Sequence, residues 1–164
     1  MAQMNFDAAD LRRAFGTFLT GVTIVTTRDA AGTPCGLTAN SFTSVSLDPP
    51  LVLVCIGRGA SNITAFEAAD RFAVNILSGD QTEVATVFST RDIDRFATVA
   101  CREAATGAPV LADCLSWFDC SLHQRLVAGD HVILIGRVED FEIRPREPLG
   151  FCRGRFVSLE RAAV

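Results

Sequence analysis

The sequence predicts a mainly β protein: an antiparallel barrel, closed or nearly closed, with short helices inserted between its strands. Roughly six to eight short strand-like runs follow one another, most of them joined by hairpin turns, which is typical of such a barrel. The 164 residues fit one domain, 1–164, and the 49% of hydrophobic residues can fill a single core. Because strands and helices alternate in the middle of the chain, an α/β sandwich is the lesser alternative.

The first part of the chain predicts a helix, a hairpin and a buried strand. A helix is expected over 7–19, since Asp7 can cap it and four apolar residues share one helical face: Leu11, Phe15, Phe18 and Leu19. The run 21–40 has β-branched or apolar residues on both sides of "DAAGT", which indicates a hairpin. The continuous apolar run 51–57, "LVLVCIG", predicts a strand buried on both faces.

The remaining elements alternate before two long strands. Ser61 can cap a helix over 62–72, and "FAVNIL" reads as a strand. Asp80 to Glu83 resembles a capping box for a helix over 81–89. From Cys114 two long strands follow, joined by "AGD", and "RGRFVSL" closes the chain with one more strand.

Composition excludes several classes of function. The formal net charge is −4 and no basic tract is present, so nucleic acid is not an expected partner. The start "MAQMNFDAAD" lacks the features of a signal peptide, and no apolar run reaches the ~20 residues of a membrane helix. We therefore expect a soluble, cytoplasmic protein without a membrane partner.

The cysteines predict neither a disulfide framework nor a metal site. Disulfide frameworks belong mainly to small secreted chains, so reduced thiols that fill small core spaces are expected. No Cys-x-x-Cys is present, and the two histidines have no ligand-like spacing, so no metal is expected. The six cysteines are Cys35, Cys55, Cys101, Cys114, Cys120 and Cys152.

Two stretches in the first half could bind a ligand. "GLTANSFTSVSLDPP" carries small and hydroxyl side chains that let a planar ligand approach the backbone, although such a loop can also satisfy only its own turns. In "CIGRGASNI" the spacing G-x-G suggests a dinucleotide fingerprint, but the third glycine is replaced by Asn62. Arg58, Ser61 and the free amides of the following helix could still hold a phosphate, and an ordinary capped helix is the alternative.

Two further candidates lie near the end of the chain. "FCRGRF" places Arg153 and Arg155 between aromatic residues, which suits a pyrophosphate or equally a charged edge strand. His131 follows a Gly-Asp turn at the mouth of a hairpin, where an imidazole could serve a reaction or simply bond its own turn. No G-x-S-x-G, Walker or H-E-x-x-H motif is present, so the sequence offers no candidate residues for a hydrolytic mechanism.

Taken together, five stretches resemble the short-chain flavin reductases, the reductase components of two-component flavin-dependent monooxygenases: "FGTFLTGVTIVTT", "GLTANSFTSVSLDPPLVLVCI", "RFAVNIL", "GAPVL" and "AGDHVILIGRV". The resemblance implies an FMN-binding split β-barrel that forms a homodimer. It implies that NADH, or alternatively NADPH, gives a hydride to FMN or FAD, and that the reduced flavin leaves for a separate oxygenase. Because the cofactors carry this chemistry, the missing catalytic motif is expected.

The resemblance also implies the site residues. His131 is the catalytic candidate, near the nicotinamide. Pro34 to Ser41 would line the flavin ring and ribityl chain, Val54 to Ile56 with Ala60 and Ser61 would reach its phosphate, and Phe151 to Gly154 would take part in pyridine nucleotide binding. The expected cofactor contacts are Pro34, Cys35, Gly36, Leu37, Thr38, Ala39, Asn40, Ser41, Val54, Cys55, Ile56, Ala60, Ser61, Phe88, Phe151, Cys152, Arg153 and Gly154.

The chain departs from the family pattern at two places. Cys152 stands where many relatives have a histidine, and Ala60 and Ser61 stand where relatives often carry a second hydroxyl or a basic residue. Two other functions stay open: a flavin-binding module without turnover, and a related barrel that reduces another acceptor. The sequence does not distinguish FMN from FAD, and NADH is favoured over NADPH on family grounds alone.

Overall fold

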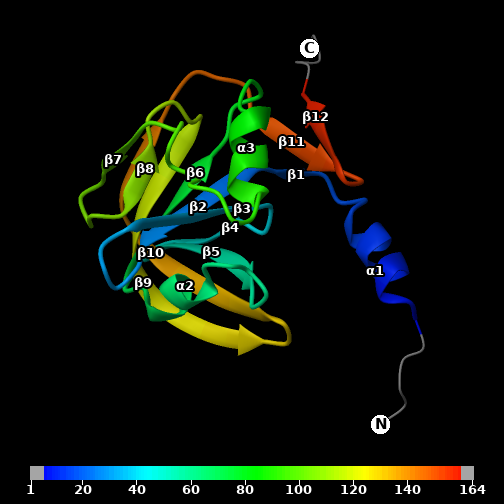
Figure 1. Cartoon of the computed structure of the whole chain (residues 1–164), viewed down its shortest axis with the longest axis horizontal. Coiled ribbons are helices and arrows are strands. Elements are labelled where there is room, and N and C mark those ends of the chain that lie inside the picture. The colour runs from blue at the N-terminus through cyan, green and yellow to red at the C-terminus, as the bar shows by residue number, and fades with distance from the viewer. Residues whose placement is uncertain (1–5, 160–164) are drawn as a thin grey trace.

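The computed structural model describes residues 6–159 and gathers most strands into one seven-stranded antiparallel sheet (Figure 1). Neighbouring strands pair in the order β3-β2-β6-β9-β10-β5-β4. The strands of this sheet are β2 (Thr23–Arg28), β3 (Pro34–Ala39), β4 (Thr43–Leu47), β5 (Pro50–Gly57), β6 (Arg71–Ile76), β9 (Ser116–Ala128) and β10 (His131–Ile143). The predicted mainly β class is therefore confirmed.

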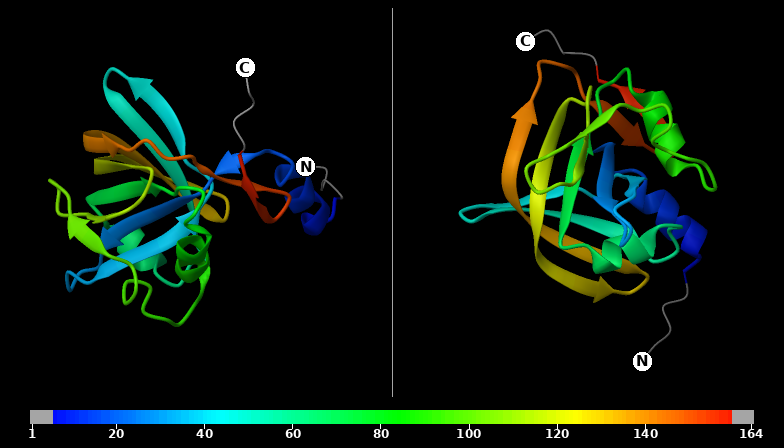
Figure 2. Two further views of the ribbon diagram at one scale, coloured as in Figure 1. Left: turned by 90° about the horizontal axis from the view of Figure 1, so that it is seen from above. Right: turned by 60° about the vertical axis from the view of Figure 1, so that its left-hand side comes forward.

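Two small sheets and three helices complete the described part of the chain. β1 (Thr20–Gly21), β11 (Leu149–Cys152) and β12 (Arg155–Ser158) form one small sheet, and β7 (Cys101–Glu103) pairs with β8 (Pro109–Leu111). The helices are α1 (Ala8–Phe15), α2 (Ile63–Ala68) and α3 (Thr82–Ser89). In Figures 1 and 2, α1 and the small sheet of β11 and β12 lie to one side of the large sheet.

The core divides into two clusters on the curved sheet. Val54, Phe72 and Leu134 belong to one cluster with Phe66 of α2, and Phe88 of α3 packs with Trp117 in the other. Strand alternation explains the first cluster, because every second residue of β5 faces inward. The other face of β5 is only half-buried, so the expected burial on both faces is wrong.

A buried asparagine ties three strands together near the centre of the sheet. The Nδ2 of Asn75, on β6, donates to the carbonyl of Ile24 on β2 at 2.9 Å. Its Oδ1 accepts from the backbone N–H of Leu111 on β8 at 2.8 Å. Asn75 is fully buried, so these bonds satisfy an amide that would otherwise be costly in the core.

The large sheet does not close into a barrel, which corrects the closed form of the prediction. Its order begins at β3 and ends at β4, and no ladder joins these two edges. The helix α3, and not another strand, covers β3. The two elements lie so close that a Cβ added at Gly36 would lie 2.6 Å from the Phe88 ring. β4 forms a hairpin with β5 that projects from the sheet in Figure 2. Thus α3 covers the edge strand β3, and the other edge strand, β4, projects away from the sheet. The two edges therefore do not pair with each other.

Helix boundaries differ from the sequence prediction in three places. α1 ends at Phe15, because Gly16 caps it and the chain then enters β1, so the predicted extent to Leu19 is wrong. α2 begins after Asn62 rather than Ser61, and it ends at Ala68 because Arg71 already pairs in the sheet. The N-cap of α3 is Gln81 and not Asp80; the Gln81 side chain instead accepts from the Ser78 N–H.

The two long strands and their turn form as predicted. β9 and β10 pair along most of their length, with His131 opposite Ala128 on β9 and opposite Gly57 on β5. Gly129 has φ +60°, the left-handed conformation that glycine adopts most readily. The turn therefore delivers His131 to the end of β5. Among residues 6–159, none of the helices is both long and apolar enough to span a membrane.

The cysteines only partly follow the prediction. All six thiols are free, and Cys114 and Cys120 are buried, as small core fillers should be. Cys101 is exposed, and the remaining three are half-buried. Core filling therefore describes two of the six positions, because the others lie at strand edges or beside cavities.

Candidate functional site

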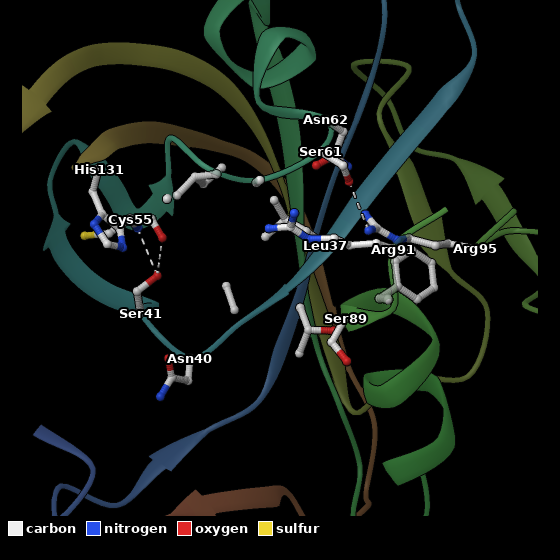
Figure 3. Close-up of a pocket in the computed structure, with 16 residues that line it drawn as sticks. Leu37, Asn40, Ser41, Cys55, Ser61, Asn62, Ser89, Arg91, Arg95 and His131 are labelled. Carbon is white, nitrogen blue, oxygen red and sulfur yellow. Dashed lines mark hydrogen bonds between the residues drawn. The ribbon is translucent and has the colours of Figure 1, made fainter. Parts of the chain in front are cut away.

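A pocket of about 330 Å³ opens where the ends of β3 and β5 meet α3 and the start of β10 (Figure 3). One wall comes from β3 and the segment after it, and another from the end of β5 and the turn into α2. The pocket gathers many of the predicted site residues: Leu37, Thr38, Ala39, Asn40, Ser41, Cys55, Ile56, Ala60, Ser61, Phe88 and His131. We call it the central pocket.

Two of the hydroxyl groups in this wall are used by the fold itself. The Ser41 hydroxyl donates to the carbonyl of Cys55 at 2.8 Å and accepts from the Cys55 N–H at 2.9 Å (Figure 3). Thr38 donates to the carbonyl of Ala85 in α3 at 2.6 Å. These two hydroxyl groups therefore link the stretch to β5 and α3 rather than satisfying its own turns. Asn40 is exposed at the pocket and has no side-chain hydrogen bond among the described contacts.

His131 stands at one end of the central pocket and is oriented by its neighbour. Its Nδ1 lies 2.7 Å from Oδ1 of Asp130, and this hydrogen bond lowers the pKa of the Asp130 carboxyl. A carboxylate only accepts, so Nδ1 carries the hydrogen and Nε2 of the neutral ring is an acceptor. A Cβ added at Gly57 would lie 3.7 Å from Nε2, so the glycine keeps this nitrogen uncovered.

Two arginines that the sequence prediction missed stand at the opposite end (Figure 3). Arg95 donates from Nη1 to the carbonyl of Gly36 at 2.7 Å and from Nη2 to the hydroxyl of Ser61 at 3.2 Å. Arg91 donates to the carbonyl of Gly59 at 3.2 Å. The segment after α3 carries both residues, and their charge in "STRDIDRF" was the only available signal.

Arg58, which the sequence suggested as the phosphate-binding charge, is not in this wall. Its Nε lies 3.8 Å from the carboxylate of Glu67, outside the central pocket. The solvated arginine, the other interpretation that the sequence allowed, fits this position, since closeness along the chain does not fix the direction of an exposed side chain. Gly57, Asn62 and Ser89 also line the pocket and were not among the predicted contacts.

Asn62 joins two walls and leaves one atom unsatisfied. Its Nδ2 donates to the carbonyl of Gly36 at 2.9 Å, beside the donor from Arg95. Its Oδ1 is buried and has no hydrogen-bond partner among the described residues. Buried acceptors are almost always paired, so this oxygen is a point where a ligand hydroxyl or amide could donate.

The other predicted contacts lie outside the central pocket. Val54 is fully buried in the core, because the alternation of β5 turns it to the opposite face. Pro34, Cys35 and Gly36 line a neighbouring cavity of about 340 Å³.

The end of the chain borders two further cavities. Phe151 lines a cavity that shares Thr38, Ala39 and Asn40 with the central pocket, whereas Arg153 and Gly154 line one beside α1. The Cys152 thiol contacts the carbonyl of Gly16 at 3.7 Å. Nucleotide binding by 151–154 remains a prediction.

The arrangement suits a flat, phosphorylated ligand. No carboxylate lines the central pocket among the described residues, so its two guanidinium groups can hold an anion. The small residues Ala39 and Ala60 leave room against the backbone for a planar ring. Within residues 6–159 no cluster of metal-binding side chains occurs. The fold and the pocket thus define a class: a β-sheet protein with a pocket suited to a planar anionic ligand.

Comparison with known proteins identifies the family within this class. The model of the "Flavin reductase like domain" matches residues 15–160, so the chain belongs to the flavin reductase-like family. It is 51% identical to the "Probable flavin reductase" of Rhizobium meliloti over 92% of this chain and 49% of the relative. It is 48% identical to the stachydrine N-demethylase reductase subunit Stc3 of the same organism, over 96% of this chain and 69% of the relative.

A solved structure is similar over almost the whole chain. The NADH:FAD oxidoreductase SgcE6 of Streptomyces globisporus, in complex with NAD and FAD fragments, has a TM-score of 0.91 and 40% identity. The similarity covers 99% of this chain and 100% of that one. By contrast, the chain spans about half the length of the "Probable flavin reductase".

Proposed function

We propose that this chain is an NAD(P)H:flavin oxidoreductase that supplies reduced FMN or FAD to a separate monooxygenase. The observation that carries the proposal is the central pocket, which has His131 at one end and Arg91 and Arg95 at the other. Membership of the flavin reductase-like family supports the same activity. A relative named as a reductase subunit, Stc3, supports a separate oxygenase partner.

The residues of the pocket would bind and align the flavin. The two arginines would neutralise its phosphate, and the backbone of β3 with Ala39 would lie against the ring. The chemistry belongs to the bound cofactors, in which a hydride passes from the nicotinamide to the flavin. His131 would use Nε2 to accept a hydrogen bond from the nicotinamide amide, held there by Asp130.

We extend the proposal to the architecture, the oligomeric state and the location of the whole protein. The open sheet would form the split barrel of the family, with flavin bound in the pocket where the ends of β3 and β5 meet. The protein would act as a homodimer, which is supported by apolar side chains that the single chain leaves exposed, including Phe15 and Phe18. We place it in the cytoplasm, where NADH and a partner oxygenase are available.

A flavin-binding module without turnover is the second candidate, because a pocket that suits a flavin does not by itself establish hydride transfer. Steady-state kinetics separates the two functions. The purified protein is mixed with NADH or NADPH, with and without FMN or FAD. NADH oxidation that requires added flavin and scales with protein concentration supports the reductase. Tight flavin binding without NADH oxidation would support the module and overturn the proposal.

A further inference from the structure

A cavity of about 770 Å³ lies away from the central pocket, at the turn between β2 and β3. Figure 1 shows this turn at the far end of the two strands from β1 and β11. The walls of the cavity are the turn itself, α2 with the start of β6, and the loop between β7 and β8. None of the described residues that line it also lines the central pocket. We call it the hairpin cavity.

Two walls of the hairpin cavity are fixed by hydrogen bonds to carboxylates. Oδ1 of Asp29 accepts from the backbone N–H groups of Ala31 at 2.9 Å and Thr33 at 2.8 Å, which fixes the turn. The fully buried carboxylate of Asp119 accepts from the N–H of Thr106 at 2.8 Å and from its hydroxyl at 2.5 Å, which fixes the loop. Walls that are ordered before a ligand binds lower the entropic cost of binding.

The two guanidinium groups that line the hairpin cavity are used differently. Arg28 donates from all three of its nitrogens, to two backbone carbonyls and, at 2.7 Å, to the carboxylate of Glu103. Arg71 donates from Nη1 to the carbonyl of Thr106, and no other hydrogen bond of its side chain joins it to the described residues. A guanidinium has five N–H groups, so Nε and Nη2 of Arg71 keep donors for a ligand.

Opposite charges line the hairpin cavity without neutralising one another. Asp29 and Asp70 line it together with Arg71, but no ion pair joins Arg71 to either carboxylate within residues 6–159. The Asp70 carboxylate has no hydrogen-bond partner in the same part of the chain, and the bonds of Asp29 use only Oδ1. Opposite charges attract, so charges that the fold keeps apart leave both signs for a third group. A ligand that carries both charges fits this arrangement.

The surface between these charges is small and apolar. The turn and α2 contribute alanines to the lining of the hairpin cavity: Ala30, Ala31, Ala65, Ala68 and Ala69. Their methyl groups can contact a short apolar side chain, whereas the charged groups at the rim fix its orientation. The cavity therefore has an apolar lining, a cation with free donors and two carboxylates with free oxygens.

We infer that the hairpin cavity binds a small free amino acid in its zwitterionic form. The carboxylate of the ligand lies on Arg71, its ammonium lies at Asp29 and Asp70, and its side chain lies against the alanines. This pairing is charge-assisted at both ends of the ligand, which makes it stronger than neutral hydrogen bonds would be. The inference does not rest on the proposed function, because the cavity and the central pocket have no lining residue in common.

Nuclear magnetic resonance of the full chain, labelled with nitrogen-15, tests the inference without an activity assay. Each small free amino acid is added up to about 10 mM, a concentration that detects weak binding. At least one should give saturable shifts of the amides of Gly32 and Gly107, which line the hairpin cavity. Absence of such shifts with every amino acid would overturn the inference. Shifts at Gly57, which lines the central pocket, in place of those two would overturn it as well.

Analogues of the amino acid that binds test the need for both charges. The amine that lacks its carboxylate and the acid that lacks its ammonium keep the same side chain. Each should bind at least about tenfold more weakly, because each leaves one end of the cavity without its partner. If either analogue binds as tightly as the amino acid, the ligand class is wrong.

Variants assign the two ends of the ligand. Asp70→Asn should raise the Kd for the amino acid about tenfold without disturbing the fold, because the exposed Asp70 carboxylate has no partner in the described chain. Arg71→Gln should raise it by a similar factor, and Arg71→Lys should raise it less because the charge is kept. Asp140→Asn, on β10 and outside the hairpin cavity, is the matched control and should leave the Kd unchanged. An unchanged Kd in folded Asp70→Asn would contradict the assignment.

Discussion

His131 shows how a single residue acquires a role from its surroundings. On the sequence it follows a turn, and a bond to that turn was the simple alternative. The structure contains that bond, to Asp130, and also places Nε2 beside Gly57 at the pocket. The two interpretations are therefore compatible, since the bond to the turn orients the ring.

The substitution His131→Ala tests this role. We expect a lower turnover or a higher apparent Michaelis constant for NADH, with the fold unchanged, because the side chain is exposed and supports no core packing. Steady-state kinetics at saturating and subsaturating NADH, together with circular dichroism, measures both. Unchanged kinetics under both conditions would reject the role. Asp130→Ala is the matched variant. It should reduce turnover less than His131→Ala does, since it frees the imidazole ring without removing it.

The buried thiols of Cys114 and Cys120 should react slowly with alkylating reagents near neutral pH. Burial raises the pKa of Cys114 to about 11 and that of Cys120 to about 12. A raised pKa keeps a thiol protonated, and only the thiolate reacts quickly with alkylating reagents. Iodoacetamide at about pH 8 should therefore label exposed Cys101 and leave Cys114 and Cys120 unlabelled until the protein unfolds. Fast labelling of Cys120 in the folded protein would contradict the described core.

At the scale of elements, the contact between α3 and β3 shapes the pocket. Gly36 is buried against Phe88, and its carbonyl accepts from both Asn62 and Arg95. A larger residue there would push α3 from the strand. The segment after α3, with both arginines, would move with it.

Gly36→Ala tests this packing. A Cβ would lie 2.6 Å from the Phe88 ring, so we expect a loss of about 1–3 kcal/mol in the free energy of unfolding. Urea denaturation measures it. Gly59→Ala is the control, since nothing lies within 4 Å of a Cβ there, and it should change the free energy by at most about 0.5 kcal/mol. Equal stability of the two variants would show that the contact is not tight.

The sequence predicts the presence of helices and strands that have a strong periodic pattern. It does not predict the residues at which they begin and end. The first half of β10 alternates between buried and more exposed residues and follows a glycine turn, and both long strands form as expected. β4 was missed because its burial pattern is almost wholly exposed, which leaves no alternation to detect. The ends of α1 and α2 depend on the pairing of Thr20 and Arg71 with distant strands, which local patterns do not contain.

The site residues were predicted through the resemblance to the flavin reductases. Leu37 to Ser41, Cys55 and His131 were implied by that resemblance and lie together in the central pocket. Arg91 and Arg95 were missed because their segment reaches the pocket through tertiary contacts with Gly36 and Gly59. Their role in binding, like that of Phe151 to Gly154, stays a prediction.

At the scale of the whole molecule, the exposed apolar residues bear on the proposed homodimer. α1 buries none of its side chains, and Phe15 and Phe18 are 69% and 76% exposed. Light scattering at micromolar concentrations should find a dimer, and the double substitution F15S and F18S should shift it toward monomer without loss of secondary structure. A monomer with full activity would contradict the dimer model.

If the proposed function is right, this chain speeds hydride transfer from NADH to flavin. Anaerobic mixing of the protein with NADH and FAD, followed by the absorbance of oxidised flavin, tests it most directly because no oxygenase or oxygen takes part. We expect the rate of this absorbance loss to rise in proportion to protein concentration and to be lower with H131A. Loss of absorbance at the rate of NADH and FAD without protein would contradict it.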